Sequence, residues 1–273
     1  MKYTFAAILF FIAASGVRAG TLYDNTVLGN NPVAFFPLAE TSGTTANNLA
    51  NTAENGTYQG GVTLGIPGGP DGNGAGFTPT GQYVGIPLYS ALEVTSSFSV
   101  EAWIDVASTN ANPLASIFAI NRALNSTGLS FAIFDDQLVL GMNNFSTNYS
   151  ETALPKLPNG VWDQVAVTWS KTVNGGAPQF YIDGILVGNN DSNTFAQSLN
   201  LTGAPGANIG VEFSNGSNGG RWVHGDIEDV SFYNTVLSST QIAADYAAGV
   251  PEPSSILLGA GGLLLLIAAR WLR

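Results

Sequence analysis

The sequence predicts an all-β fold, an antiparallel two-sheet sandwich or jelly roll. Short segments in which apolar and polar residues alternate recur roughly every 8 to 15 residues, and this spacing is typical of antiparallel sandwiches. The chain contains 33 Gly and 13 Pro, and only 10% of its residues are charged. Many turns and few charges indicate strands rather than helices.

Residues 97–106 give the clearest strand, because their side chains alternate between two faces: Phe98, Val100, Ala102, Ile104 and Val106 share one, and Ser99, Glu101, Trp103 and Asp105 share the other. The same reasoning predicts strands at 33–38, 56–58, 76–77, 83–86, 115–121, 129–134, 137–142, 161–170, 179–182, 185–187, 208–210 and 225–233. Residues 60–71 are expected to be a turn-rich connection.

Two tight turns and one helix complete the predicted domain. Asp135-Asp136 and Asp183-Gly184 each lie between two strand-like runs, which is typical of a β-hairpin. Residues 238–248 begin with a Ser/Thr cluster and end at Gly249, which is the pattern of a capped helix. Three tryptophans on regular strands are expected in the core: Trp103, Trp162 and Trp169.

The N-terminus has the three parts of a secretory signal peptide. Lys2 provides a positive charge, residues 5–14 are apolar, and residues 17–19 end in Ala19 before Gly20. The apolar run of about ten residues is too short to cross a bilayer, which needs about 20. We therefore predict a signal peptide at residues 1–19, with cleavage after Ala19.

The C-terminus, residues 250–273, has a second targeting pattern. Pro251-Glu252-Pro253 precedes an uncharged apolar stretch at 256–269, and arginines end the chain. A helix of this length spans about 21 Å, which is short for a permanent anchor, although a simple tail anchor stays an alternative. The segment resembles the PEP-CTERM sorting signal. The resemblance implies transient membrane insertion through this helix, and recognition and cleavage by an exosortase-type enzyme.

The charge of the remaining domain, residues 20–249, excludes one class of partner. It carries four basic and eighteen acidic residues, a net charge of −14. Such a surface repels phosphate backbones, so we expect no nucleic-acid binding. The chain has no cysteine and a single histidine, which excludes disulfides, thiolate chemistry and multi-histidine metal sites.

Six segments, in order, resemble the laminin-G-like, concanavalin A-like jelly-roll family. They are PVAFFPLAETSG, NGTYQGG with the strands up to QYVGIP, SFSVEAWI, GVWDQVAVTWS, QFYIDGILVG and GDIEDVSFYNTVLSSTQIAADYAAG. Together they run from about Pro32 to Gly249. The resemblance implies a two-sheet jelly roll that presents loops to carbohydrate or protein partners.

Asp226 and Glu228 are the pair best placed for chemistry. On a strand they point the same way, with Cα atoms roughly 6.6 to 6.8 Å apart. The segment is similar to the carboxylate strand of jelly-roll glycoside hydrolases, which use two carboxylates. Those enzymes carry a third carboxylate further along, where this chain has Val230 and Ser231. We therefore expect no catalysis, and no catalytic residue is assigned.

Calcium is the one cofactor that the sequence makes a candidate. Jelly rolls of the resembled kind often hold one Ca²⁺ between an N-terminal acidic residue and the closing strand, and calcium takes six to eight oxygen ligands. The candidate ligands are Glu40, Asp226, Glu228 and Asp229. The alternative is that these are ordinary solvated or strand-end carboxylates of an acidic protein.

Trp222 and His224 are the candidates for ligand contact. Trp222 follows a Gly- and Ser-rich loop and is the best candidate for an exposed aromatic that stacks on a glycan. His224, at the start of a strand, is the one side chain that can act as an imidazole base. The simpler interpretation is that both are ordinary structural side chains.

These observations predict where the protein is sent more closely than what it binds. We expect a bacterial protein exported to the cell envelope, cell surface or extracellular matrix, where its domain binds polysaccharide or surface proteins without catalysis. Two alternatives stay open: a glycan-active hydrolase on the same fold, and a purely structural matrix component.

Overall fold

The computed structural model describes residues 19–70, 72–78, 81–107, 114–121, 127–143, 149–150, 154–189, 199–214, 217–218 and 221–250. The predicted signal peptide and sorting tail, including Pro251, Glu252 and Pro253, lie outside the described residues except for Ala19 and Val250. Within the described part, neither helix has the length and apolar content to cross a membrane. The two targeting segments stay predictions.

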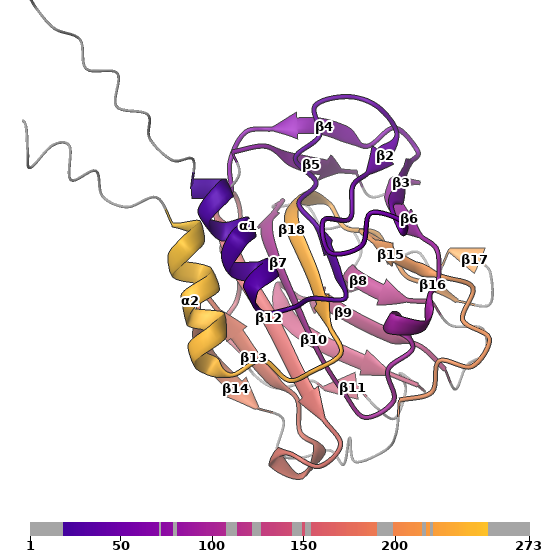
Figure 1. Cartoon of the computed structure of the whole chain (residues 1–273), viewed down its shortest axis with the longest axis vertical. Coiled ribbons are helices and arrows are strands. Elements are labelled where there is room, and N and C mark those ends of the chain that lie inside the picture. Colours follow the sequence, from indigo (N-terminus) through magenta and orange to yellow (C-terminus); the bar gives the residue numbers. More distant parts are fainter. Residues whose placement is uncertain are drawn as a thin grey trace, which may run out of the picture.

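Two eight-stranded sheets form the domain (Figure 1). Sheet A has the order β14-β13-β12-β7-β18-β5-β4, and β1 also pairs with β18. Its strands are β1 (Ala34–Phe36), β4 (Thr63–Ile66), β5 (Gly74–Phe77), β7 (Ser97–Val106), β12 (Trp162–Ser170), β13 (Gln179–Ile182), β14 (Ile185–Asn189) and β18 (Gly225–Tyr233).

Sheet B has the order β11-β10-β9-β8-β15-β6-β3-β2. Its strands are β2 (Thr45–Ala46), β3 (Gly56–Gln59), β6 (Tyr83–Ile86), β8 (Leu114–Ile120), β9 (Leu129–Phe134), β10 (Gln137–Met142), β11 (Tyr149–Ser150) and β15 (Ala207–Ile209). A small separate hairpin joins β16 (Phe213–Ser214) to β17 (Ser217–Asn218). The predicted all-β, antiparallel two-sheet sandwich is confirmed.

The predicted hairpin turns are confirmed by their backbone angles. Asp135 and Asp136, between β9 and β10, have φ of 51° and 64°. Asp183 and Gly184, between β13 and β14, have φ of 51° and 73°. Two successive residues with positive φ match the right-handed twist of the strands that they join.

The main core lies between the two sheets and is organised around stacked aromatic rings. Phe232 of β18 stacks on Phe98 of β7 at a centroid distance of 6.1 Å and on Phe118 of β8 at 5.3 Å. Phe98 also packs against Trp169 at 5.6 Å. Because Phe118 belongs to sheet B and the others to sheet A, this group joins the two sheets. The face predicted for residues 98–106 does point into this core.

Two helices cover the outer face of sheet A (Figure 1). Helix α2 (Ser239–Gly249) was predicted, and its capping box between Ser238 and Gln241 fixes its start. Helix α1 (Ala19–Gly29) was not predicted. Its Gly, Thr, Asp and Asn residues have low helix propensity, so the helix depends on packing: Tyr23 and Val27, one turn apart, are fully buried in a second apolar cluster with Trp103 of β7.

The two helices run antiparallel. The side chain of Gln241, in the first turn of α2, donates a hydrogen bond to Asn30, just after α1. At the other end Gly249 lies against the ring of Tyr23. Further strands were missed. The strand β4 lies in the segment expected to be a turn-rich connection, since its glycine weakened the strand pattern, and β2, β11, β16 and β17 are only two residues long.

Candidate functional site

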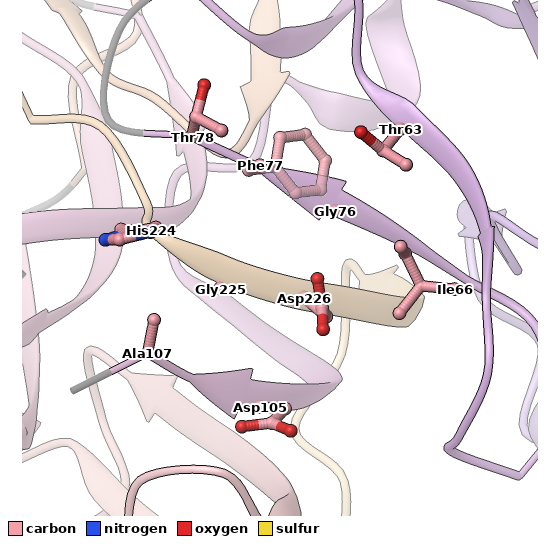
Figure 2. A pocket seen from close by; sticks show the side chains of 10 residues that line it. All are labelled: Thr63, Ile66, Gly76, Phe77, Thr78, Asp105, Ala107, His224, Gly225 and Asp226. Carbon is pink, nitrogen blue, oxygen red and sulfur yellow. The ribbon is translucent and has the colours of Figure 1, made fainter. Parts of the chain in front are cut away.

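A pocket of about 370 Å³ opens at the outer face of sheet A, where β4, β5, β7 and β18 lie side by side (Figure 2). Its volume is at the lower end of the range of ligand sites. The lining residues are Thr63, Ile66, Gly76, Phe77, Thr78, Asp105, Ala107, His224, Gly225 and Asp226. The pocket thus combines two carboxylates, an imidazole, two hydroxyls and apolar side chains.

Asp105 and Asp226 are direct cross-strand neighbours. They are register partners in the antiparallel pair of β7 and β18, so their Cβ atoms lie about 4.5 to 5.5 Å apart on one face. Partial burial raises the pKa of both carboxyls. The negative charge of Asp105 raises the pKa of Asp226 further, whereas His224 lowers it. The site therefore holds two carboxylates in one small, partly desolvated space.

Gly225 makes this juxtaposition possible. It begins β18 with φ of 147°, and a Cβ atom there would lie 2.2 Å from the backbone oxygen of Asp105. Only a residue without a side chain lets β18 start this close to β7. Gly225, between His224 and Asp226, thus allows the close approach of β18 to β7 that places Asp226 beside Asp105.

Glu228 does not reach the pocket. It shares the outward face of β18 with Asp226, as predicted, but is fully buried. The backbone of Gly69 passes directly over its carboxyl group, so that a Cβ atom on Gly69 would overlap Glu228 Oε2. The two carboxylates considered for catalysis are therefore not exposed to one common ligand.

The other predicted calcium ligands lie elsewhere. Glu40 accepts hydrogen bonds from the side chain of Asn47 at 2.7 Å and from Tyr58 at 2.7 Å, beside a second pocket of about 290 Å³. Asp229 is fully buried at a bulge of β18 with φ of 56°. The described residues contain no group of three or more Asp, Glu or His side chains able to hold a metal ion. The structure does not gather the four residues into one site, and calcium binding stays a prediction.

Trp222 is buried, so the expectation of an exposed aromatic is wrong. It is only 7% exposed. Its ring packs against Tyr83 of β6 at 6.1 Å and Phe213 of β16 at 6.0 Å. Tyr83 comes from a distant part of the sequence, which is why the local pattern did not reveal the burial. His224, in contrast, does line the pocket.

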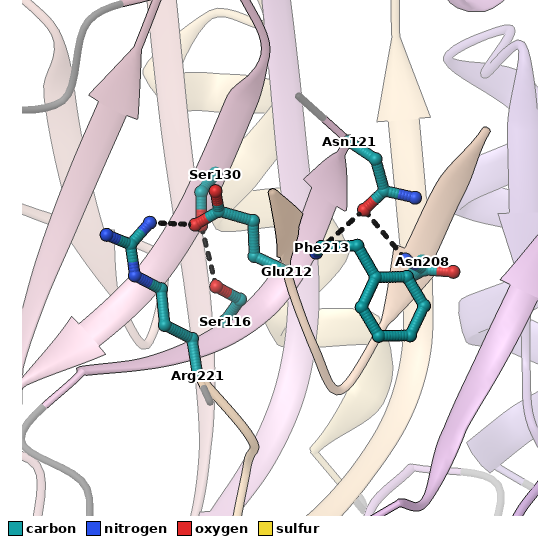
Figure 3. A network of polar contacts seen from close by, with 7 residues as sticks. All are labelled: Ser116, Asn121, Ser130, Asn208, Glu212, Phe213 and Arg221. Atoms are coloured by element: carbon teal, nitrogen blue, oxygen red, sulfur yellow. Dashed lines mark hydrogen bonds and ion pairs between the residues drawn. The ribbon is translucent and has the colours of Figure 1, made fainter. Parts of the chain in front are cut away.

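A polar network covers part of the face of sheet B that points away from sheet A (Figure 3). Arg221 forms an ion pair with the fully buried Glu212. Nearby, the hydroxyl groups of Ser116 and Ser130 lie 2.8 Å apart. No local sequence pattern indicates this network, since its members are spread over four segments.

An amide cluster continues the same network. Asn121 Oδ1 accepts hydrogen bonds from the side chain of Asn208 at 2.7 Å and from the backbone N–H of Phe213 at 3.1 Å (Figure 3). These groups are hydrogen-bonded to one another and buried. Because these polar groups are already hydrogen-bonded to one another, they are less available to a ligand than the groups in the pocket on sheet A. That pocket is the better candidate for ligand contact.

Fold and family comparisons place the chain in a known class, the concanavalin A-like β-sandwiches. Residues 78–243 match the family model described as the concanavalin A-like lectin/glucanases superfamily. The match covers more than half of the chain, so the chain belongs to this family. A comparison with curated protein sequences found no match.

Solved structures with the same fold include a carbohydrate-bound domain. Domain 4 of AbnA, an extracellular arabinanase of Geobacillus stearothermophilus, in complex with arabinotriose, has a TM-score of 0.54 and 17% identity. The similarity covers 79% of this chain and 98% of that domain.

Toxin binding domains are also similar. The binding domains of botulinum neurotoxin serotype G and of Paraclostridial mosquitocidal protein 1 both have TM-scores of 0.58, with 12% and 13% identity. Each of the two similarities covers 80% of this chain. The chain spans about half the length of these toxin domains, 51% and 52%. At such identities the similarity shows the fold alone.

Proposed function

We propose that this protein is an exported, non-catalytic glycan-binding domain whose ligand occupies the pocket between Asp105 and Asp226. The observation that carries the proposal is the direct cross-strand pairing of these two carboxylates at one pocket. Carboxylates accept hydrogen bonds from neighbouring sugar hydroxyls, and Thr63, Thr78 and His224 add further polar groups. The arabinotriose-bound domain of the same fold supports a carbohydrate ligand.

The charge of the site favours neutral sugars. The chain has a net charge of −11, and the described pocket is lined by two carboxylates but no lysine or arginine. A uronate or sulfated sugar would bring a further negative charge into this space, which costs free energy. We therefore expect neutral oligosaccharides to bind and polyuronates not to bind.

The burial of Glu228 supports binding without catalysis. Hydrolysis of a glycosidic bond needs two carboxylates that flank the bond. Glu228, the natural partner of Asp226 along β18, is buried under the Gly69 backbone. Asp105 and Asp226 face the pocket from adjacent strands, where they act together as hydrogen-bond acceptors.

Substitution of the two aspartates tests the site. Asp105→Asn and Asp226→Asn each replace a carboxylate oxygen by an amide NH₂, so each is expected to weaken binding of a neutral oligosaccharide at least about tenfold, or about 1.4 kcal/mol. The ligand is chosen on a glycan array and its affinity measured by isothermal titration calorimetry. Glu93→Gln, at an exposed glutamate that precedes the end of β7 opposite to Asp105, serves as the control with unchanged affinity.

Three results would overturn this account. Unchanged affinity in both aspartate variants would remove the pocket as the binding site. Release of reducing sugar by the wild type, lost in Asp105→Asn or Asp226→Asn, would favour the glycan-active hydrolase instead. A protein that binds no glycan on the array would favour the structural matrix component.

Export is the second part of the proposal, and it rests on the two terminal patterns of the sequence. Mass spectrometry of the protein isolated from its source is expected to show a chain that starts at Gly20 and ends near Pro251. This result would mean that a signal peptidase and an exosortase-type enzyme have acted. A chain that retains Arg273 would instead indicate a tail anchor.

A further inference from the structure

One of the tryptophans expected in the core is only partly buried. Trp103, Trp169 and Trp222 are at most 7% exposed. Trp162, the first residue of β12, is more exposed than these three and packs at the margin of the apolar cluster under the helices. Among the tryptophans of the described chain, it is therefore the one that a ligand can best reach.

Trp162 lies in line with the carboxylates of the pocket. It is the register partner of Asp105 in the pair of β12 and β7, and Asp226 is the partner of Asp105 on the other side. Register partners point to the same face of a sheet, with Cβ atoms about 4.5 to 5.5 Å apart. The Trp162 side chain therefore leaves the outer face of sheet A beside Asp105, on the side away from Asp226.

The same row continues through the pocket. Asp226 pairs with Gly76 of β5, and Gly76 with Thr63 of β4; these three residues line the pocket (Figure 2). Five neighbouring strands thus contribute one row that runs across the sheet from Trp162 to Thr63. With strands about 4.8 Å apart, the row is about 19 Å long, which is longer than a single sugar ring.

Two glycines hold the indole of Trp162 by its edges. A Cβ atom on Gly68 would lie 2.0 Å from Nε1 but 2.8 and 2.9 Å from the neighbouring ring atoms Cδ1 and Cε2. A Cβ atom on Gly74 would lie 3.0 Å from Cη2, at the far end of the ring. Because the backbone meets the ring at its edges, it fixes the orientation of the ring without covering its faces.

We propose that Trp162 is the aromatic wall of the glycan site, on which the apolar face of a pyranose ring stacks while Asp105 accepts hydrogen bonds from the sugar hydroxyls. This inference rests on the proposed function and gives its ligand a chemical class. One face of the indole packs toward the apolar cluster under the helices, and the other is available to the sugar.

The groups along the row match the two kinds of surface on a sugar. A hexopyranose such as glucose, galactose or mannose carries several C–H groups on one side of its ring, which form an apolar face for an aromatic side chain, and hydroxyl groups around its rim. Arabinofuranose has a smaller ring and offers less of this apolar face. We therefore expect a neutral oligosaccharide of hexopyranose units that lies across the strands.

The fluorescence of Trp162 reports stacking directly. The full chain is titrated with oligosaccharides of glucose, galactose and mannose of increasing length, and with arabinotriose. We expect binding of a hexopyranose chain to change the tryptophan emission and to lower its quenching by acrylamide, because the sugar covers the accessible indole. Both effects should disappear in Trp162→Phe, while calorimetry still detects binding.

A second substitution at the same position separates stacking from packing. Trp162→Phe keeps a flat aromatic face and is expected to lose no more than about threefold in affinity. Trp162→Leu keeps apolar bulk against the cluster but has no flat face, so its affinity should fall at least about tenfold. Thermal unfolding of both variants shows whether their folds are equally intact.

The glycine at the edge of the indole provides an independent test with a matched control. Gly68→Ala places a methyl group against Nε1 of Trp162, so we expect it to displace the ring, shift its emission and weaken binding. Gly72→Ala also changes a glycine with positive φ, but its Cβ atom would have no other atom within 4 Å. The affinity of Gly72→Ala should therefore equal that of the wild type.

The contrary outcomes separate this inference from the proposed function. If a hexopyranose chain binds and Asp226→Asn weakens it, but the emission is unchanged and Trp162→Leu binds normally, the aromatic wall is wrong and the pocket stays. Tighter binding of arabinotriose than of every hexopyranose chain would contradict the ligand class. If the wild type binds no oligosaccharide, the proposed function fails and this inference with it. If Trp162→Leu does not fold, the fluorescence of the wild type and of Trp162→Phe decides.

Discussion

Phe232→Ala is expected to lower the free energy of unfolding by about 3 to 5 kcal/mol. Phe232 is fully buried and stacks on Phe98 from its own sheet and on Phe118 from the other. Removal of the ring opens a cavity where the two sheets meet and leaves both neighbouring rings without a contact. Urea unfolding followed by tryptophan fluorescence measures the change.

Leu186→Ala is the matched control for this variant. Leu186 lies on the edge strand β14 and is 46% exposed, so its truncation should cost no more than about 1 kcal/mol. Equal losses in the two variants would mean that the aromatic group between the sheets is not the centre of the core.

Gly225→Ala is expected to cost about 2 to 4 kcal/mol in stability and to abolish ligand binding at the pocket. The new methyl group would lie 2.2 Å from the backbone oxygen of Asp105, and the positive φ is strained for alanine. Relief of the clash requires β18 to move away from β7, which separates Asp226 from Asp105. Chemical unfolding and calorimetric titration measure the two effects.

Gly29→Ala provides the comparison. A Cβ atom on Gly29, the last residue of α1, would have no other atom within 4 Å, so stability should change by no more than about 0.5 kcal/mol. A stable Gly225→Ala protein with normal ligand affinity would show that the close approach of the two strands is not required.

The strands were predictable where apolar and mostly polar residues alternate. Residues 97–106 do so, and β7 has these bounds, although helices α1 and α2 bury its outer face as well. The hairpin turns were equally clear, because Asp-Asp and Asp-Gly favour positive φ. Helix α1 could not be predicted in this way, since its own residues favour turns and only the burial of Tyr23 and Val27 makes the helix stable.

The candidate site was predictable only in part. Asp226 and His224 were recognised from their sequence, but Asp105 was placed only as one face of a strand. Its neighbour across the sheet depends on the register of β7 with β18, which shifts at a bulge between Glu228 and Ser231. No local pattern contains that register, because the 118 residues from 107 to 224 separate the two strands.

Burial by distant segments explains the remaining differences. Glu228 is covered by the backbone at Gly69, and Trp222 by Tyr83 of β6. Glu228 was considered because it shares a strand face with Asp226, and Trp222 because it follows a Gly-rich loop, which is typically exposed. The contacts that bury them join segments more than a hundred residues apart.

The location of a bound oligosaccharide tests the central claim most directly. An NMR titration of the protein with a neutral oligosaccharide selected on the array would follow every backbone amide. We predict shifts at Asp105, at 224–226 and at 76–78, on the strands that line the pocket. Shifts confined to the outward face of sheet B, at Ser116, Ser130 and Asn208, would contradict the proposed site.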